Sequence, residues 1–172
     1  MMIDLETLSV SPDAIILSLG AVHFDPWGTG ITKELYFRIS VDEQDALNRT
    51  IDPNTLDWWS RQDPAIMEEA FSPDVRVPLL EAVDRFHKFA WGCKTFWSHG
   101  ATFDLVMIEH LYHQLQKPLP WSYVHLRDTR TLFDLGVTPE MPRGGKHDAL
   151  QDAIRQAVGV QNCYRKLNIP KQ

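Results

Sequence analysis

Hydrophobic and polar residues follow two patterns in the first part of the chain, and both patterns predict β-strands. Residues 14–24 are an almost unbroken apolar run, which is typical of a strand that is covered on both faces of a sheet. Apolar and polar residues alternate over 35–41, which is typical of a half-exposed strand. Short loops join these segments to a first predicted strand at residues 2–8, so we expect an antiparallel meander of three strands.

The later part of the chain alternates between strands and helices. Strands are predicted at 95–98 and 124–129, whereas apolar residues at helical spacing predict helices at about 78–91, 104–116 and 148–166. This order predicts an α/β fold with a mixed sheet, in which parallel strands extend the antiparallel meander and helices flank both faces.

Residues 42–78 interrupt this alternation. The segment is polar and punctuated by prolines, with one short helix predicted at 65–71, and we expect it to leave the sheet and lie near the functional site. No internal repeat, low-complexity tract or linker divides the chain. Its 172 residues are 44% hydrophobic, which is sufficient for a single domain over 1–172 with a sizeable core.

Composition also bears on the location of the protein. No apolar run approaches the ~18 residues that a membrane-spanning helix needs, so we expect no membrane partner. The first strand begins almost at Met1, without the basic and apolar regions of a signal peptide. Cys93 and Cys163 lack metal-site spacing and are expected to be reduced thiols. These features predict a cytoplasmic protein.

Four acidic residues and one histidine are the candidate chemistry. Asp4 and Glu6 lie two residues apart on the first predicted strand, so their side chains point to the same face. Asp104 starts a predicted helix after a glycine-containing turn, a position where an aspartate or Thr102 can also serve as a helix cap.

The last two candidates, His147 and Asp152, flank the start of the last predicted helix. Helical residues turn by about 100° each, so five positions would place the two side chains about 140° apart. If both reach one site, His147 must lie in the loop before the helix, and residues 142–146 with two glycines provide such a loop. Alternatively, His147 lies on the surface, and Asp148 or Asp152 favours the first helical turn through the helix dipole.

This set of residues has the composition of a two-metal phosphodiesterase site. Two divalent ions roughly 3.5–4 Å apart can activate an attacking water and stabilise a leaving oxygen. Mg²⁺ and Mn²⁺ prefer oxygen ligands, which requires several carboxylates at one point. A neutral imidazole beside the attacking water can accept its proton.

The motifs resemble those of the DEDDh branch of the DnaQ-like 3'–5' exonucleases, which have the ribonuclease H-like fold. The resemblance covers nearly the whole chain in family order and rests on Ile3-Asp4-Leu5-Glu6-Thr7, Phe103-Asp104 and His147-Asp148-Ala149-Leu150-Gln151-Asp152-Ala153. Residues 15–24, 51–59 and 127–131 resemble a smaller group of bacterial and phage exonucleases and exoribonucleases. Another branch of the family has a tyrosine at the position of Asp148. This sequence has no tyrosine there, so it resembles the histidine branch.

The resemblance implies a role for each motif residue. Asp4, Glu6 and Asp152 would bind the metal ion that activates water, and Asp4 and Asp104 would bind the second ion near the leaving 3' oxygen. His147 would be the general base. The cofactors would be two Mg²⁺ or Mn²⁺ ions. The expected reaction releases nucleoside 5'-monophosphates from single-stranded or frayed 3' ends of RNA or DNA.

Seven further residues are expected to contact the substrate. Leu5 and Thr7 carry backbone groups that could reach a ribose 2'-hydroxyl. The family leads us to expect that Leu8 wedges between the last two bases. Aromatic rings can stack on bases, and arginines can bind phosphate or pair instead with Asp128 or Asp134. The predicted substrate-binding residues are Leu5, Thr7, Leu8, Trp58, Phe103, Arg127 and Arg130.

The formal net charge of −6, without any lysine- or arginine-rich run, predicts a short contact with a strand end rather than a long groove. This favours an exonuclease over an endonuclease that acts on long duplexes. Two alternatives stay open, a ribonuclease H-like endonuclease and a non-catalytic nucleic-acid-binding module on the same fold. The choice between RNA and DNA is also open, and a homodimer is expected by analogy only.

Overall fold

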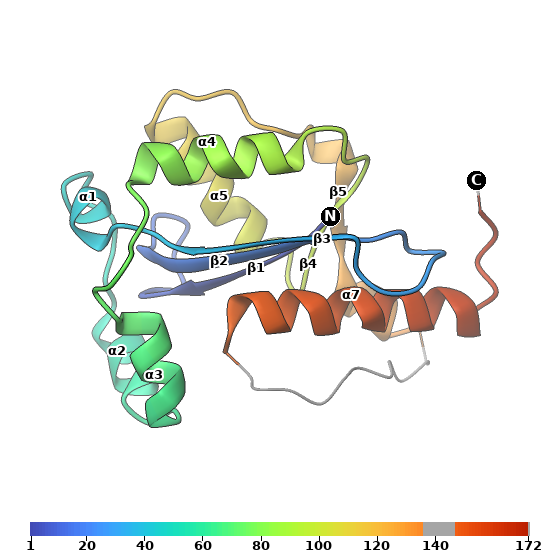
Figure 1. Ribbon diagram of the computed structural model, residues 1–172, viewed down its shortest axis with the longest axis horizontal. Coiled ribbons are helices and arrows are strands. Elements are labelled where there is room, and N and C mark those ends of the chain that lie inside the picture. Colours follow the sequence, from blue (N-terminus) through green and yellow to red (C-terminus); the bar gives the residue numbers. More distant parts are fainter. Residues whose placement is uncertain (136–146, 172) are drawn as a thin grey trace.

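The structure, a computed structural model, describes residues 1–135 and 147–171. The sheet has five strands in the order β3-β2-β1-β4-β5. Three consecutive strands form the antiparallel meander, and two further strands extend the sheet in parallel (Figure 1). The strands are β1 (Met2–Thr7), β2 (Ile16–His23), β3 (Lys33–Arg38), β4 (Phe96–Ser98) and β5 (Leu126–Asp128). The predicted mixed sheet is therefore confirmed.

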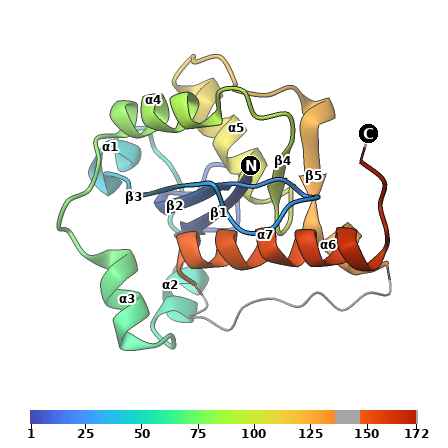
Figure 2. The same ribbon diagram turned by 45° about the vertical axis from the view of Figure 1, so that its right-hand side comes forward.

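Long helices cover both faces of the sheet (Figures 1 and 2). Helices α4 (Leu79–Ala90) and α5 (Asp104–Gln114) lie on one face, and α7 (Ala149–Lys166) lies on the other. Every residue of β2 except His23 is buried, as its apolar run predicted. No helix in the described ranges is both long enough and apolar enough to cross a membrane.

Residues 42–78 leave the sheet as predicted but contain more helix than expected. The segment includes α1 (Val41–Asp45), α2 (Pro53–Trp59) and α3 (Pro64–Phe71), of which only α3 was predicted. The prolines do not interrupt regular structure here, because Pro53 and Pro64 each stand at the start of a helix. Proline suits that position because the first helical N–H needs no partner within the helix.

All five strands are shorter than predicted, and for two of them the structure gives a local reason. The third strand ends at Arg38 rather than at residue 41, because Ser40 caps α1 by accepting a hydrogen bond from the backbone N–H of Glu43. The strand predicted at 124–129 begins only at Leu126, after a 3₁₀ turn. It then leads directly into α6 (Thr129–Phe133), a short helix that was not predicted.

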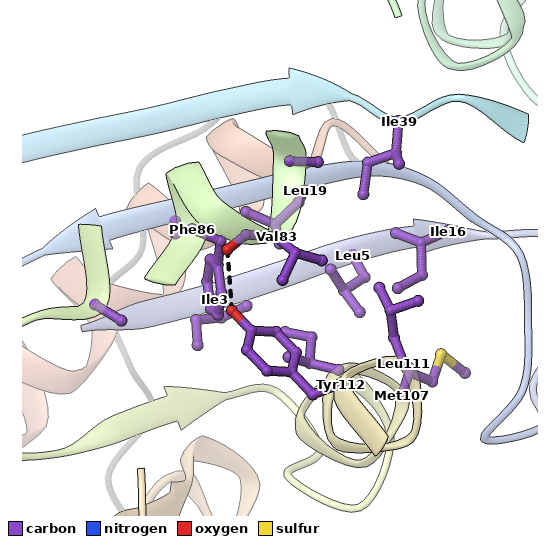
Figure 3. Close-up of a cluster of buried hydrophobic side chains, with 14 of the residues drawn as sticks. Ile3, Leu5, Ile16, Leu19, Ile39, Val83, Phe86, Met107, Leu111 and Tyr112 are labelled. Atoms are coloured by element: carbon purple, nitrogen blue, oxygen red, sulfur yellow. Dashed lines mark hydrogen bonds between the residues drawn. The ribbon is translucent and has the colours of Figure 1, made fainter. Parts of the chain in front are cut away.

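The larger core cluster lies between the sheet and the α4–α5 layer (Figure 3). Each fully buried aliphatic side chain contributes roughly 1.5–3 kcal/mol of transfer free energy. The phenolic hydroxyl of Tyr112 donates to the carbonyl of Val83 at 3.1 Å, which satisfies the one polar atom of that buried ring. The cluster includes Ile3 and Leu5 of β1, Ile16 and Leu19 of β2, Val83 and Phe86 of α4, and Met107, Leu111 and Tyr112 of α5.

On the opposite face, α7 packs unusually close to β2. A Cβ atom added at Gly20 would lie 2.2 Å from the carbonyl carbon and oxygen of Ala149, so a larger residue would force the helix away. Gly20 is also the cross-strand partner of Asp4. This glycine therefore allows the first turn of α7 to lie beside the strand that carries the acidic pair.

Candidate active site

The five predicted catalytic residues line one cavity of about 850 Å³ at the end of the sheet. They come from segments that are far apart in the chain, namely β1, the start of α5 and the start of α7. The other walls of the cavity include residues of α2 and of the β4–α5 connection. The five residues are Asp4, Glu6, Asp104, His147 and Asp152.

Asp4 and Glu6 occupy the face of β1 that the strand period predicted. Their neighbour Met2 packs in the core cluster on the α7 side, whereas Ile3 and Leu5 pack in the cluster under α4 and α5. Glu6 is 7% exposed, so its carboxylate is almost fully withdrawn from solvent.

Asp104 reaches the same point from the first turn of α5. It does not cap the helix, because Phe103 occupies the cap position without a side-chain hydrogen bond. Its Oδ1 atom instead accepts a hydrogen bond from the backbone N–H of Leu5 at 3.1 Å. The pairing of β1 with β4 is limited to Met2 and Trp97, so the Leu5 N–H has no sheet partner on that side. This hydrogen bond fixes Asp104 against the acidic strand.

His147 lies just before α7, the position predicted if His147 and Asp152 reach one site. The helix cap is Asp148, whose Oδ1 accepts hydrogen bonds from the backbone N–H groups of Leu150 and Gln151. His147 has a φ of +66°, an uncommon conformation for a residue other than glycine. Its backbone N–H donates to Oδ2 of Asp152 at 2.7 Å. The predicted glycine loop at 142–146 lies outside the described residues.

A second contact to His147 comes from α2. The indole of Trp58 meets the imidazole edge to face, with ring centroids 4.7 Å apart. The adjacent Trp59 is buried and donates its Nε1–H to the carbonyl of Thr7 at 2.9 Å. Trp59 is thus a core residue at the cavity wall, whereas Trp58 is more exposed and lies in the cavity beside the histidine.

Three acidic side chains of the cavity have pKa values above their ordinary values, chiefly because they are buried. Burial, followed by the charges of Asp152 and Asp104, raises the pKa of Glu6 to about 8. Burial likewise raises the pKa of Asp104 to about 7. The pKa of Asp4 is raised well above its ordinary value by burial and by Asp104 and Glu6. Such a cluster needs a compensating positive charge, and the oxygen donors suit a hard divalent cation.

Candidate ligand atoms also converge. Three possible ligand atoms lie within 4.8 Å of one another, and they belong to Glu6, His147 and Asp152. Asp4 and Asp104 complete the lining of the same cavity. The donor set therefore fits a site for divalent metal ions.

These pKa values predict that the metal-free protein loses stability as the pH rises. The folded protein holds protons on Glu6 and Asp104 up to a pH of about 8 and about 7, whereas the unfolded chain releases them near their ordinary pKa values of 4.5 and 3.8. Since the folded state binds more protons, stability falls across this interval. Mn²⁺ binds the ionised carboxylates of the folded state and should reduce or reverse the fall.

The measurement is the melting temperature between pH 5 and pH 8, in EDTA and in Mn²⁺. Glu6→Gln is the matched variant, because it removes one of the titrating groups and should weaken the pH dependence in EDTA. A wild-type melting temperature in EDTA that rises steadily over this range, with the same slope in Glu6→Gln, would contradict the prediction.

Five of the seven predicted substrate-binding residues line the cavity, and two do not. The five are Leu5, Thr7, Trp58, Phe103 and Arg130. Leu8 is 4% exposed and packs against the core with Trp59, so the structure does not place it to wedge between bases. Arg127 lies outside the cavity lining and donates to the carbonyls of Val124 and Leu126.

Asp128, the alternative partner of the arginines, has a structural role instead. Its Oδ1 accepts a hydrogen bond from the backbone N–H of Arg130, and its Oδ2 accepts one from Ala101. The carboxylate thereby caps α6 and holds the β4–α5 connection. Among the described residues no ion pair joins Asp128 to Arg130, whose side chain contributes to the cavity wall.

The sequence interpretation missed several residues of the cavity, and three of them bear on the site. Val10 is 71% exposed and lines the cavity two residues beyond Leu8. Arg155 forms an ion pair with Oδ1 of Asp152 at 3.0 Å. Gln156 donates to Oδ1 of Asp4 at 2.7 Å. The last two follow Asp152 by three and four positions on one helix, a spacing that could have identified them because such residues share a helix face.

The family is decided by a match over most of the chain. The model of a family described as the 3'-5' exoribonuclease Rv2179c-like domain matches residues 1–164. The chain belongs to this exoribonuclease domain family. The predicted membership of the 3'–5' exonucleases is thereby confirmed, and membership of a family of this type implies metal dependence.

Solved structures match the exoribonuclease domain in fold. Exonuclease I of E. coli in complex with a 5cy-dT13 oligonucleotide is 14% identical with a TM-score of 0.68, and the match covers 97% of this chain and 40% of that chain. Exonuclease I from Methylocaldum szegediense is 18% identical with a TM-score of 0.62, covering 96% and 40%. Exonuclease X in complex with 5' overhanging duplex DNA is 16% identical with a TM-score of 0.59, covering 99% and 95%.

These matches confirm the predicted ribonuclease H-like fold. The chain spans about two fifths of the length of the exonuclease I chains that it matches. No protein with curated annotation matches the sequence.

Proposed function

We propose that this protein is a two-metal-ion 3'–5' exonuclease, which removes nucleoside 5'-monophosphates one at a time from single-stranded or frayed 3' ends, with RNA as the preferred substrate. The observation that carries the proposal is the convergence of four carboxylates and one histidine in a single cavity of a chain that belongs to an exoribonuclease family. The preference for RNA rests on the description of that family.

The carboxylates of Asp4, Glu6, Asp104 and Asp152 would hold the metal ions. When bound, two Mg²⁺ or Mn²⁺ ions supply the activation of water and the neutralisation of charge that phosphodiester hydrolysis requires. His147 would accept the proton of the attacking water at a ring nitrogen. Its edge-to-face contact with Trp58 limits the rotation of the imidazole.

The other walls of the cavity suit the end of a nucleic acid strand. Phe103 and Val10 offer apolar surface to the terminal bases, and aromatic rings stack on any base without a sequence requirement. Arg130 and Arg155 bring positive charge to a cavity that is otherwise acidic, where a phosphate must enter. The proposed contact between the protein and the nucleic acid covers only the strand end, in agreement with the negative net charge of the chain.

Digestion of matched single-stranded RNA and DNA tests this function directly. With 5'-labelled substrates and Mn²⁺, we expect a ladder that shortens from the 3' end, faster on RNA, and no cleavage in EDTA. A chemically blocked 3' end should stop the reaction. Internal fragments, or cleavage that persists with the blocked end, would instead indicate the endonuclease. Binding of RNA without any cleavage in Mn²⁺ would indicate the non-catalytic module.

Three features of the proposal are predictions from sequence. They are a single exonuclease domain over residues 1–172, a cytoplasmic location and a homodimer. Single-stranded oligonucleotides are the ligands of the exonuclease I structures that match the chain, and for this protein we propose the same class of partner.

A further inference from the structure

We propose that Gln156 is a positioning residue, which holds the carboxylate of Asp4 in the orientation that binds the metal ions. This inference rests on the proposed function, because it assigns a role at the same metal site. In the proposed function Asp4 would bind both metal ions, so it would be the central ligand of that site. A residue that fixes its rotation therefore affects the whole site.

The contact is direct and comes from the element that also carries Asp152. Gln156 follows Asp152 by four positions, so both side chains project from the same face of α7. Its Nε2 donates a hydrogen bond to Oδ1 of Asp4 at 2.7 Å. Gln156 is 8% exposed and lines the cavity, so this hydrogen bond is shielded from solvent.

The carbonyl oxygen of the same amide makes no hydrogen bond within the described residues. Oε1 of Gln156 is buried and has no hydrogen-bond partner among the described residues. A buried carbonyl without a partner lowers stability. Gln156 is therefore a poor packing residue, and its one polar contact within the described structure is the donation to Asp4.

A group that hydrogen-bonds a metal ligand without itself binding the metal fixes the orientation of that ligand. Loss of such a group typically weakens metal binding. An amide suits this role here for an electrostatic reason. It donates an N–H to Asp4 without adding a further negative charge to a site that already contains four carboxylates. A lysine or arginine at this position would instead compete with the cation.

A second buried glutamine on α7 provides a matched control. Gln161 is 3% exposed, and both ends of its amide are held. Its Nε2 donates to the carbonyls of Asp25 and Gly30 at 3.0 and 2.9 Å, and its Oε1 accepts from the N–H of Gly30 at 3.0 Å. This glutamine fastens the loop after β2 to the helix, away from the cavity.

The experiment compares Gln156→Met with Gln161→Met in the full chain. Mn²⁺ binding is measured by calorimetry without substrate, and the melting temperature is measured in EDTA. Gln156→Met should bind Mn²⁺ about 10- to 100-fold more weakly, with an unchanged or higher melting temperature. Gln161→Met should show the reverse, a lower melting temperature and unchanged Mn²⁺ affinity. Gln156→Asn, whose side chain is too short to reach Asp4, should lose affinity like Gln156→Met.

A double-mutant cycle tests whether the effect passes through Asp4. In an Asp4→Asn background, Gln156→Met should cause no further loss of Mn²⁺ affinity. An equal loss of Mn²⁺ affinity in both backgrounds would overturn the role of Gln156, and so would wild-type Mn²⁺ affinity in Gln156→Met and Gln156→Asn. In either case, cleavage of RNA by the wild-type protein would leave the proposed function intact. A wild-type protein that neither binds Mn²⁺ nor shortens RNA would overturn the proposed function, and this inference with it.

Discussion

Replacement of Asp104 by asparagine should slow 3'-end cleavage by about 10³-fold or more and leave the protein folded. A metal ion contributes several kcal/mol of transition-state stabilisation, and a loss of about 4 kcal/mol corresponds to a factor of about 10³. Asparagine keeps an oxygen that can accept the hydrogen bond from Leu5, so the contact between β1 and α5 should persist. It removes the negative charge that the proposed second metal ion needs.

The same substitution should not destabilise the metal-free protein. Burial raises the pKa of Asp104 to about 7, and the Asp104 charge raises the pKa values of Asp4 and Glu6. A neutral side chain relieves this repulsion, so the melting temperature in EDTA at pH 8 should be equal to or above that of the wild type.

Cleavage rate, circular dichroism and melting temperature together check this prediction. Asp84→Asn is the matched control, because Asp84 lies on the exposed surface of α4 and its ion pair with Lys117 is solvent-accessible. That variant should retain wild-type activity. Substantial activity in a folded Asp104→Asn protein would show that Asp104 does not bind a catalytic metal ion.

Replacement of His147 by asparagine should lower the turnover number by about 10²- to 10⁴-fold, the range that a general base contributes. Asparagine is the informative choice because it tolerates a positive φ, and His147 has a φ of +66°. The hydrogen bond from the backbone N–H to Asp152 should therefore remain. Since all four carboxylates are unchanged, Mn²⁺ affinity should fall much less than turnover.

The check is to measure turnover and Mn²⁺ affinity on the same preparation. His113→Asn serves as the control, because His113 is an exposed histidine near the end of α5 and should be silent in both measurements. Unchanged turnover in His147→Asn would remove the proposed role as base. A loss of Mn²⁺ affinity as large as the loss of turnover would assign His147 as a metal ligand instead.

Local periodicity in the sequence determined much of the site. The period of a strand placed Asp4 and Glu6 on one face, and the structure has them on the same cavity wall. The period of a helix predicted that His147 lies outside α7 if His147 and Asp152 reach one site. The structure has His147 just before the helix. These predictions succeeded because they depend only on the geometry of neighbouring residues.

Leu8 shows what local alternation does not specify. Alternation places Leu8 on the same face of β1 as Asp4 and Glu6, but Leu8 is 4% exposed because it packs in a core cluster with Trp59 of α2. Val10, two residues further on, is exposed and lines the cavity. The burial of Leu8 depends on where α2 lies, and no sequence pattern marked that position.

The sequence by itself therefore determined the order of the strands and of the long helices, the five candidate residues that line the cavity and the local direction of most of them. Only the tertiary structure decided the distances between segments. Gly20 lets α7 approach β2, Asp104 binds the unpaired N–H of Leu5, and Gln156 reaches Asp4 across 152 positions of the chain. Each contact joins residues far apart in sequence, and it depends on how closely two elements pack, which no local pattern specifies.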